Sequence, residues 1–119
     1  MLPRPYRLNK EKEIDLVFKQ GKAFFSQFLT LKFLANNLVN SRFCFIVGNK
    51  ISKKSSKRNL LKRQLRAIIW LNLAKIKPSQ DIIIIAKAGS RILEMTYQEL
   101  EQQMLWLLKK ASLVERVKG

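Results

Sequence analysis

The sequence contains no histidine, which removes the side chain that most often acts as a general base near neutral pH. Its one cysteine, Cys44, therefore has neither a histidine to activate it nor a second cysteine for an internal disulfide. The eight acidic residues form no convincing catalytic pair, and the four glycines form no phosphate-binding loop. We therefore expect no catalytic residue and no metal site in the protein itself.

Long apolar runs are also missing. No segment approaches the ~20 apolar residues of a membrane-spanning helix, and the start, MLPRPYRLNKEKE, lacks the apolar stretch of a signal peptide. Cys44 lies within FCFIV, where a cysteine is typical of a small buried hydrophobe. These features predict a protein of the reducing cytoplasm with no membrane partner.

Acidic residues are scarce and unevenly placed. The 119 residues include 24 Lys and Arg against 8 Asp and Glu, a formal charge of +16, and no acid occurs between Asp15 and Asp81. Self-repulsion of this size opposes the compact state unless a polyanion or counterions relieve it. A hydrophobic fraction of 47% nevertheless supports a packed core. The preferred partner is a nucleic acid, and an anionic membrane surface is the lesser alternative.

The length suits one nucleic-acid-binding domain, residues 1–119, with an ordered core at about 8–112 and a frayed tail from 112 onward. The expected elements are a helix over 9–21, strands over 28–35 and 42–48 joined as a hairpin, a helix from Ser55 or Ser56 to about Ala74, a strand over 81–89 and a helix over 96–111. The run DIIIIAKAG is typical of a strand buried on both faces. Thr96 and Glu99 have capping-box spacing. The order predicts an α+β sandwich with a small mixed sheet and a long basic crossover helix.

The long predicted helix is amphipathic, and its polar side carries only positive charge. Its apolar side contains Leu61, Leu65, Ile68 and Ile69. The opposite stripe contains Asn59, Lys62, Arg63, Arg66 and Trp70. No acid stands four residues from these cations to offset their repulsion, and the planar fork of arginine can hold two phosphate oxygens. The nucleic-acid-binding residues expected in this helix and the loop before it are Lys50, Lys53, Lys54, Lys57, Arg58, Asn59, Lys62, Arg63 and Arg66.

The stretch KRNLLKRQLR resembles the RNR signature of bacterial ribonuclease P protein components. Its surroundings agree in order, with an early helix ending VFKQG, FIVGNK before the basic loop, then DIIIIAK and a final helix. The resemblance implies a left-handed βαβ crossover, against the usual right-handed rule. It also implies a subunit that assists a catalytic RNA, with Mg²⁺ bound mainly by that RNA, in endonucleolytic removal of the 5′ leader from precursor tRNA. No protein partner is implied.

Two positions depart from the family pattern. Arg58 and Asn59 match the first two residues of the signature, but Leu60 stands where an arginine is usual. Lys50 matches the first residue of a usual lysine pair, and Ile51 replaces the second. We expect these two departures to change the strength of the RNA contact rather than its existence.

The resemblance further implies a cleft between the first helix and the sheet that holds the single-stranded leader against aromatic rings. Ile14 and Phe18 fall at the matching helix positions, and Phe33 is the expected aromatic residue on the sheet. The competing interpretation of Phe18 is an ordinary core residue.

Two other function classes stay open. A ribosomal or other structural RNA-binding protein would carry the same charge without a processing role. A DNA-binding regulator would need a helix-turn-helix pair, whereas the basic helix here follows a strand and a loop.

Overall fold

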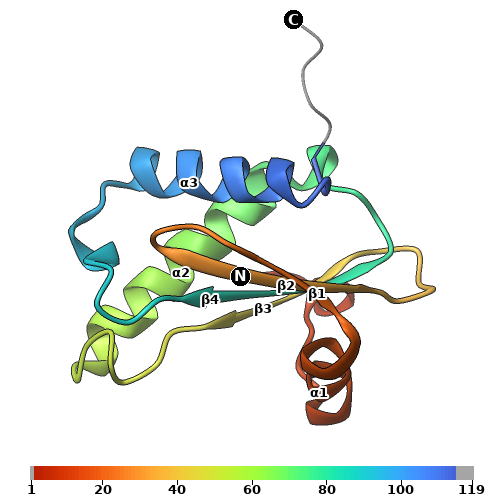
Figure 1. Cartoon of the computed structure of the whole chain (residues 1–119), viewed down its shortest axis with the longest axis horizontal. Coiled ribbons are helices and arrows are strands. Elements are labelled where there is room, and N and C mark those ends of the chain that lie inside the picture. Colours follow the sequence, from red (N-terminus) through yellow and green to blue (C-terminus); the bar gives the residue numbers. More distant parts are fainter. Residues whose placement is uncertain (1, 115–119) are drawn as a thin grey trace, which may run out of the picture.

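Four strands form one mixed sheet with helices on both of its faces (Figure 1). The structure is a computed structural model and describes residues 2–114. The helices are α1 (Glu11–Gln20), α2 (Ser55–Leu71) and α3 (Tyr97–Lys110), and the strands are β1 (Lys22–Phe25), β2 (Leu29–Ala35), β3 (Arg42–Ile46) and β4 (Gln80–Ala86). Short 3-10 turns occur at Arg4–Tyr6, Leu73–Lys75 and Ile92–Glu94. The predicted α+β class is confirmed.

β4 lies inside the sheet, whose strand order is β1-β2-β4-β3. It pairs antiparallel with β2 and parallel with β3, so Ile83 stands opposite both Lys32 and Cys44. Ile82, Ile83 and Ile84 are fully buried. The continuous β-branched run therefore forms a strand covered on both faces, as predicted. The parallel pairing also makes α2 the crossover between β3 and β4.

The predicted hairpin between 28–35 and 42–48 is wrong, because β4 inserts between β2 and β3. The hairpin instead joins β2 to β1, a four-residue strand that the sequence analysis missed. Its turn is held by Ser26, whose Oγ accepts hydrogen bonds from the N–H groups of Phe28 and Leu29. The isoleucine run of β4 is apolar on both faces, which is typical of an inner strand, and this preference overrides the turn-like residues between β2 and β3.

The main core lies between the sheet and the pair α2 and α3. The apolar residues predicted for α2 are all buried: Leu61, Leu65, Ile68 and Ile69. α3 buries Leu100, Met104, Leu107 and Leu108, with Ala111 buried just beyond its end and Tyr97 half-buried at its start. The capping box of Thr96 and Glu99 is confirmed, with both reciprocal hydrogen bonds present. The core also includes Leu2, Leu113 and Val114, so it extends beyond residues 8–112, and the predicted fraying does not hold for Leu113 and Val114. Residues 115–119 of that tail lie outside the described residues.

α2 is shorter than predicted and begins without the expected serine cap. Its N-cap residue is Lys54, and no side chain accepts a hydrogen bond from the first turn. It ends at Leu71, where the buried amide of Asn72 donates to the Ile68 carbonyl (2.8 Å) and to Glu101 of α3 (3.1 Å). Asn72 therefore ends the helix by binding its last turn to α3, a contact that local sequence does not reveal.

α1 packs on the opposite face of the sheet, where Val17 contacts Leu8 and Ile83. Gly21 connects α1 directly to β1, and its N–H donates to the Val17 carbonyl at 2.8 Å. A Cβ atom at Gly21 would clash with that carbonyl and would lie 2.7 Å from the Phe33 carbonyl oxygen. Glycine is therefore required here by close backbone approach.

Candidate RNA interface

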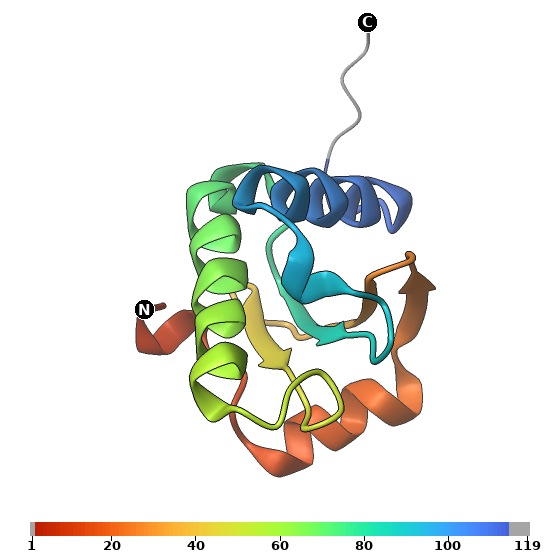
Figure 2. The same ribbon diagram turned by 90° about the vertical axis from the view of Figure 1, so that its left-hand side faces the viewer.

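The polar side of α2 carries positive charge that no acid neutralises. Asn59 and Arg63 are exposed, while Lys62 and Arg66 are half-buried above the apolar side of the helix. In residues 2–114 the salt bridges join Arg42 to Glu13 and Asp81, and Arg91 to Glu94, so none involves α2. Figure 2 shows α2 along the side of the sheet next to β3, facing away from α1 and α3 over most of its outer surface. The cations are therefore available to an external anion.

The loop before α2 extends this cationic surface. Lys50, Lys53, Lys54 and Lys57 are all exposed. Arg58 is partly buried because its Nη1 donates to the Ser52 carbonyl at 2.7 Å, and this bond fixes the loop against the helix. The uncapped N–H groups of the first turn point toward the same loop, and such groups favour an anion. The nine predicted RNA-binding residues thus all lie on α2 or in the loop directly before it, and none of them is fully buried.

A hollow of about 300 Å³ beside β3 adds a cation that the sequence analysis missed. Lys62 and Arg66 line it together with Arg7, above a floor that includes Phe43 and Phe45. Arg7 is placed there by a parallel β-bridge with Phe43. The basic segment PRPYRLNK shows a cation at this position, but only the pairing of this segment with β3 places Arg7 in the same hollow as Arg66.

The two α1 residues predicted for the leader cleft differ in burial. Ile14 packs partly buried beside Val17, and Phe18 keeps 38% of its surface exposed. The Lys32 ammonium lies 4.7 Å from the centre of the Phe18 ring. Phe18 is therefore not an ordinary core residue, and Lys32 places a cation beside its ring.

The prediction that Phe33 faces the same cleft is wrong. Phe33 packs against the main core on the other face of the sheet and stacks on Phe24, with ring centroids 6.0 Å apart. Side chains alternate along a strand, so its neighbours Lys32 and Leu34 face α1 instead. The alternation was visible in the sequence, but which face α1 covers was not.

Arg42 fixes α1 against the sheet through a buried network. Its Nε and Nη2 donate to the two carboxylate oxygens of Asp81 at 2.8 and 2.7 Å, and its Nη1 lies 2.9 Å from Glu13 of α1. Asn36 donates a further hydrogen bond to Asp81 at 2.8 Å. The hydrogen bond to Asp81 raises the pKa of Arg42, and the bond to Glu13 adds to this shift. Three residues far apart in sequence thus set the position of the predicted leader cleft.

Cys44 lies on the same sheet face as α1 and is half-buried. Burial raises the pKa of its thiol, while the charge of nearby Lys62 acts in the opposite direction. A thiol with a raised pKa is protonated at neutral pH and is a poor nucleophile.

The family model for ribonuclease P matches residues 2–112 of this chain. The chain belongs to the bacterial ribonuclease P protein family. It is 35% identical to the ribonuclease P protein component of Syntrophomonas wolfei, covering 98% of this chain and 95% of that protein. The corresponding protein of Streptococcus pyogenes serotype M5 is also 35% identical, covering 97% and 93%.

Solved structures of ribonuclease P proteins share the fold. The Thermotoga maritima protein, solved in complex with 1-(4-fluorophenyl)-2-thiourea, is 31% identical with a TM-score of 0.81, covering 87% of this chain and 98% of that one. The Staphylococcus aureus protein has a TM-score of 0.82 at 23% identity, covering 92% and 98%, and this likeness concerns the fold alone.

The function of this chain follows from its membership of the bacterial ribonuclease P protein family. The chain is the protein component of a ribonucleoprotein endoribonuclease that processes the 5′ end of precursor tRNA, and it implies the ribonuclease P RNA as partner. The ribosomal and DNA-regulator interpretations are therefore set aside. Within residues 2–114, no helix combines the length and apolarity needed to cross a bilayer.

Proposed function

We propose that α2, the loop before it and Arg7 bind the catalytic RNA by its phosphates. The observation that carries this assignment is the face of α2, whose cations lack acidic partners among the described residues. When arginine and lysine side chains neutralise phosphates, the counterions condensed on the RNA are released into solution. This release favours binding strongly at low salt. The hollow between Arg7, Lys62 and Arg66 continues the same charge toward β3.

The proposal also assigns the single-stranded 5′ leader of precursor tRNA to the cleft beside α1. Phe18 offers an exposed ring, Ile14 an apolar wall, and Lys32 an ammonium group within reach of the same ring. Aromatic rings accept any base by stacking, and this suits a leader whose sequence differs between precursors. Lys32 and Leu34 replace Phe33 as the contributions of β2 to this face.

Magnesium belongs to the RNA in this scheme. Among residues 2–114, no three His, Cys, Asp or Glu side chains come together as a metal site. The donor set of the described part of the chain therefore does not fit a metal cage. The side chains of this protein bind and orient RNA, and the reactive groups lie outside the protein.

The experiment that tests this function combines leader removal with a salt titration. Protein, catalytic RNA and precursor tRNA together should release the leader, whereas protein and Mg²⁺ without the RNA should release none. Arg63→Ala should weaken binding of the catalytic RNA and lower the slope of log K against log salt by about 0.7–0.9.

Arg91→Ala is the matched control, because Arg91 is an exposed arginine already paired with Glu94 at 2.8 Å. It removes the same charge from the chain, yet it should leave the slope nearly unchanged. An unchanged slope for Arg63→Ala, or equal effects of the two substitutions, would contradict a phosphate site on α2. Cleavage by the protein alone would contradict the assignment of chemistry to the RNA.

A further inference from the structure

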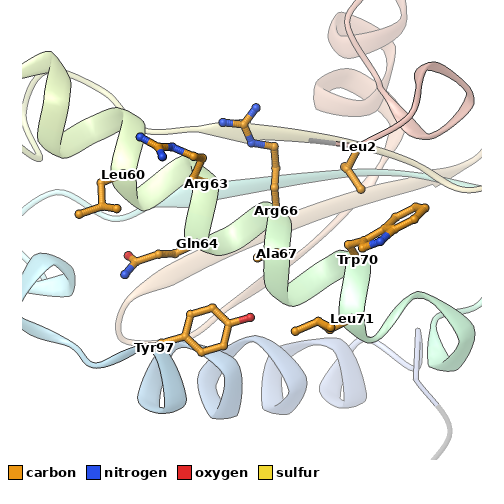
Figure 3. Close-up of a pocket in the computed structure, with 9 residues that line it drawn as sticks. All are labelled: Leu2, Leu60, Arg63, Gln64, Arg66, Ala67, Trp70, Leu71 and Tyr97. Atoms are coloured by element: carbon orange, nitrogen blue, oxygen red, sulfur yellow. The ribbon is translucent and has the colours of Figure 1, made fainter.

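A second hollow runs along the C-terminal half of α2, on the side away from β3 (Figure 3). Its volume is about 510 Å³, and aromatic and apolar side chains form most of its wall. Trp70, Leu71 and Leu60 keep 48%, 70% and 52% of their surfaces exposed. This concentration of exposed apolar surface lies on the helix that also carries the cationic stripe. We refer to it as the Trp70 groove, defined by Leu60, Arg63, Arg66, Trp70, Leu71 and Tyr97.

The groove is positively charged at its rim and has no acidic residue in its lining. Arg63 and Arg66 stand on one side of it, while Leu71 and Tyr97 stand on the other (Figure 3). Glu101 of α3 accepts a hydrogen bond from Asn72 at 3.1 Å. A positively charged partner is thus disfavoured, and a ligand with both an anionic group and an apolar face is complementary.

Trp70 is held in place at one edge and open over much of its surface. Tyr6 contacts it edge-on, with ring centroids 5.8 Å apart and an interplanar angle of 77°. Opposite, burial raises the pKa of Tyr97, with a smaller contribution from Glu101, so its hydroxyl is protonated at neutral pH and can donate a hydrogen bond. A supported ring in a groove that also contains a hydroxyl donor is suited to a flat heterocycle that has hydrogen-bond acceptors.

Arg66 and Trp70 are neighbours on one side of α2, and both line the groove. The two residues are four apart on α2, so their Cβ atoms lie about 5–6 Å from each other. This is similar to the reach from a phosphate to its own base. Arg63 lies one turn further along the same stripe, where the next phosphate of a strand could bind.

We propose that the Trp70 groove receives an unpaired nucleobase of the catalytic RNA, stacked on Trp70, with adjoining phosphates on Arg66 and Arg63. The inference rests on the proposed RNA-binding role of α2 and deepens it from phosphate contact to base contact. The groove continues the cationic stripe, so an RNA strand held by Arg63 and Arg66 passes its mouth. A second copy of this chain is disfavoured, because two copies of the groove would bring four arginines together.

The first test measures affinity for the catalytic RNA over a range of salt. Trp70→Leu keeps an apolar side chain but removes the ring, and it should weaken binding about fivefold to a hundredfold, the usual range for one stacked base. The salt slope should stay unchanged, because stacking releases no counterions. Trp70→Phe should recover most of the affinity. Trp106→Leu is the matched control, since Trp106 is a tryptophan of α3, 52% exposed, outside the groove.

A second variant separates stacking from support of the N-terminal segment. Tyr6→Leu removes the edge-on contact between the Tyr6 and Trp70 rings but leaves Trp70 in the groove. It should therefore lower RNA affinity less than Trp70→Leu does. Trp70 fluorescence, read in a Trp106→Phe background, should be quenched by the RNA and saturate with binding.

Each result bears on one step of the inference. Unchanged affinity for Trp70→Leu together with unquenched fluorescence would overturn base stacking while leaving the Arg63 salt slope, and thus the phosphate site, intact. Equal losses for Trp70→Leu and Trp106→Leu would also overturn it. A concentration-dependent dimer that Trp70→Leu abolishes, with RNA affinity unchanged, would assign the groove to a second copy instead. A flat salt response of Arg63→Ala would contradict the proposed function itself.

Discussion

α2 and α3 both pack on the main core, yet they differ in how their charges are arranged. α3 begins with the complete capping box of Thr96 and Glu99 and ends with Lys109 and Lys110, which suits the helix dipole at both ends. α2 begins without a side-chain cap, has no acid in its first turn, and has cations where the dipole disfavours them. Both helices bury four or more apolar residues, so the difference is confined to their outer surfaces.

The comparison shows how a binding surface can be distinguished from a solvated one. Helix stability alone would favour the pattern of α3 on both helices. α2 departs from that pattern at its cap, its first turn and its polar stripe, all on the side that faces away from the core. When several residues on one surface each lower helix stability, we infer that the surface binds a ligand.

The largest expected effect concerns the ion pair between Arg42 and the buried carboxylate of Asp81. Arg42→Ala leaves the carboxylate of Asp81, 8% exposed, without its main partner, and should lower the free energy of unfolding by about 3–5 kcal/mol. Urea denaturation measures this loss. Leader binding should weaken as well, because Glu13 of α1 loses its ion pair. A stable variant with normal leader binding would show that α1 is positioned by apolar contacts alone.

The second prediction removes the uncompensated charge of α2. Arg63→Ala combined with Arg66→Ala should lower RNA affinity about tenfold or more for each contact, or about 1.4 kcal/mol per tenfold step. The free energy of unfolding should stay constant or rise, since repulsion between neighbouring cations falls. Parallel filter-binding and denaturation experiments distinguish these outcomes. A large loss of stability would mean that the two side chains hold the fold.

The third prediction tests the opposite face of the sheet. Phe18→Ala should weaken binding of precursor tRNA more than binding of mature tRNA, by about 1–3 kcal/mol for one stacked base. The control is Leu16→Ala, which truncates another exposed apolar residue of α1 (44%). Equal losses for both RNAs would argue against a leader contact at Phe18.

The fourth prediction exchanges the start of α2 for that of α3. Lys54→Asp places a capping acid at the N-cap position, and it should stabilise the protein by about 0.5–2 kcal/mol while weakening RNA binding. Thr96→Ala, which removes the cap of α3, should lower stability by a similar amount with RNA affinity unchanged. If Lys54→Asp left RNA binding intact, the loop before α2 would lie outside the interface.

The smallest effect is expected at the departure from the family signature. Leu60 is 52% exposed and is adjacent to the residues of the cationic stripe on α2. Leu60→Arg should therefore tighten RNA binding, steepen the salt slope by a little under one unit, and leave stability nearly unchanged. Leu60→Gln supplies the control, because it adds polarity without charge. A slope equal to that of the wild type would place Leu60 away from any phosphate.

Local patterns in the sequence were sufficient for most of the elements and for the α2 surface. The positions of Leu61, Leu65 and Arg63 on α2 follow from a period of 3.6 residues, and the capping box follows from two residues three apart. The end of α2 did not follow, because Asn72 ends it through a contact with Glu101 of α3. Helix interiors are set by neighbours in sequence, while this terminus depends on a neighbour in space.

The predicted leader cleft beside α1 shows the same contrast between neighbours in sequence and neighbours in space. Phe18 was predicted because the helix period and the family resemblance place it beside Ile14. Phe33 was misplaced because alternation gives two faces of a strand without saying which helix covers each. Arg42 was not found at all, since its partners Glu13 and Asp81 lie 29 and 39 residues away in the chain.

The amino-acid sequence by itself determined the α+β class, the buried central strand, the amphipathic α2 and the nucleic-acid partner, because charge and hydrophobic period are local properties. Only the tertiary structure decided that β4 separates β2 from β3, that Arg7 meets Arg66, and that Trp70 lines a groove opposite Tyr97. Each of these depends on how segments pair across the fold. Burying the run of isoleucines in β4 on both faces fixes that pairing, and no short stretch of the chain contains this requirement alone.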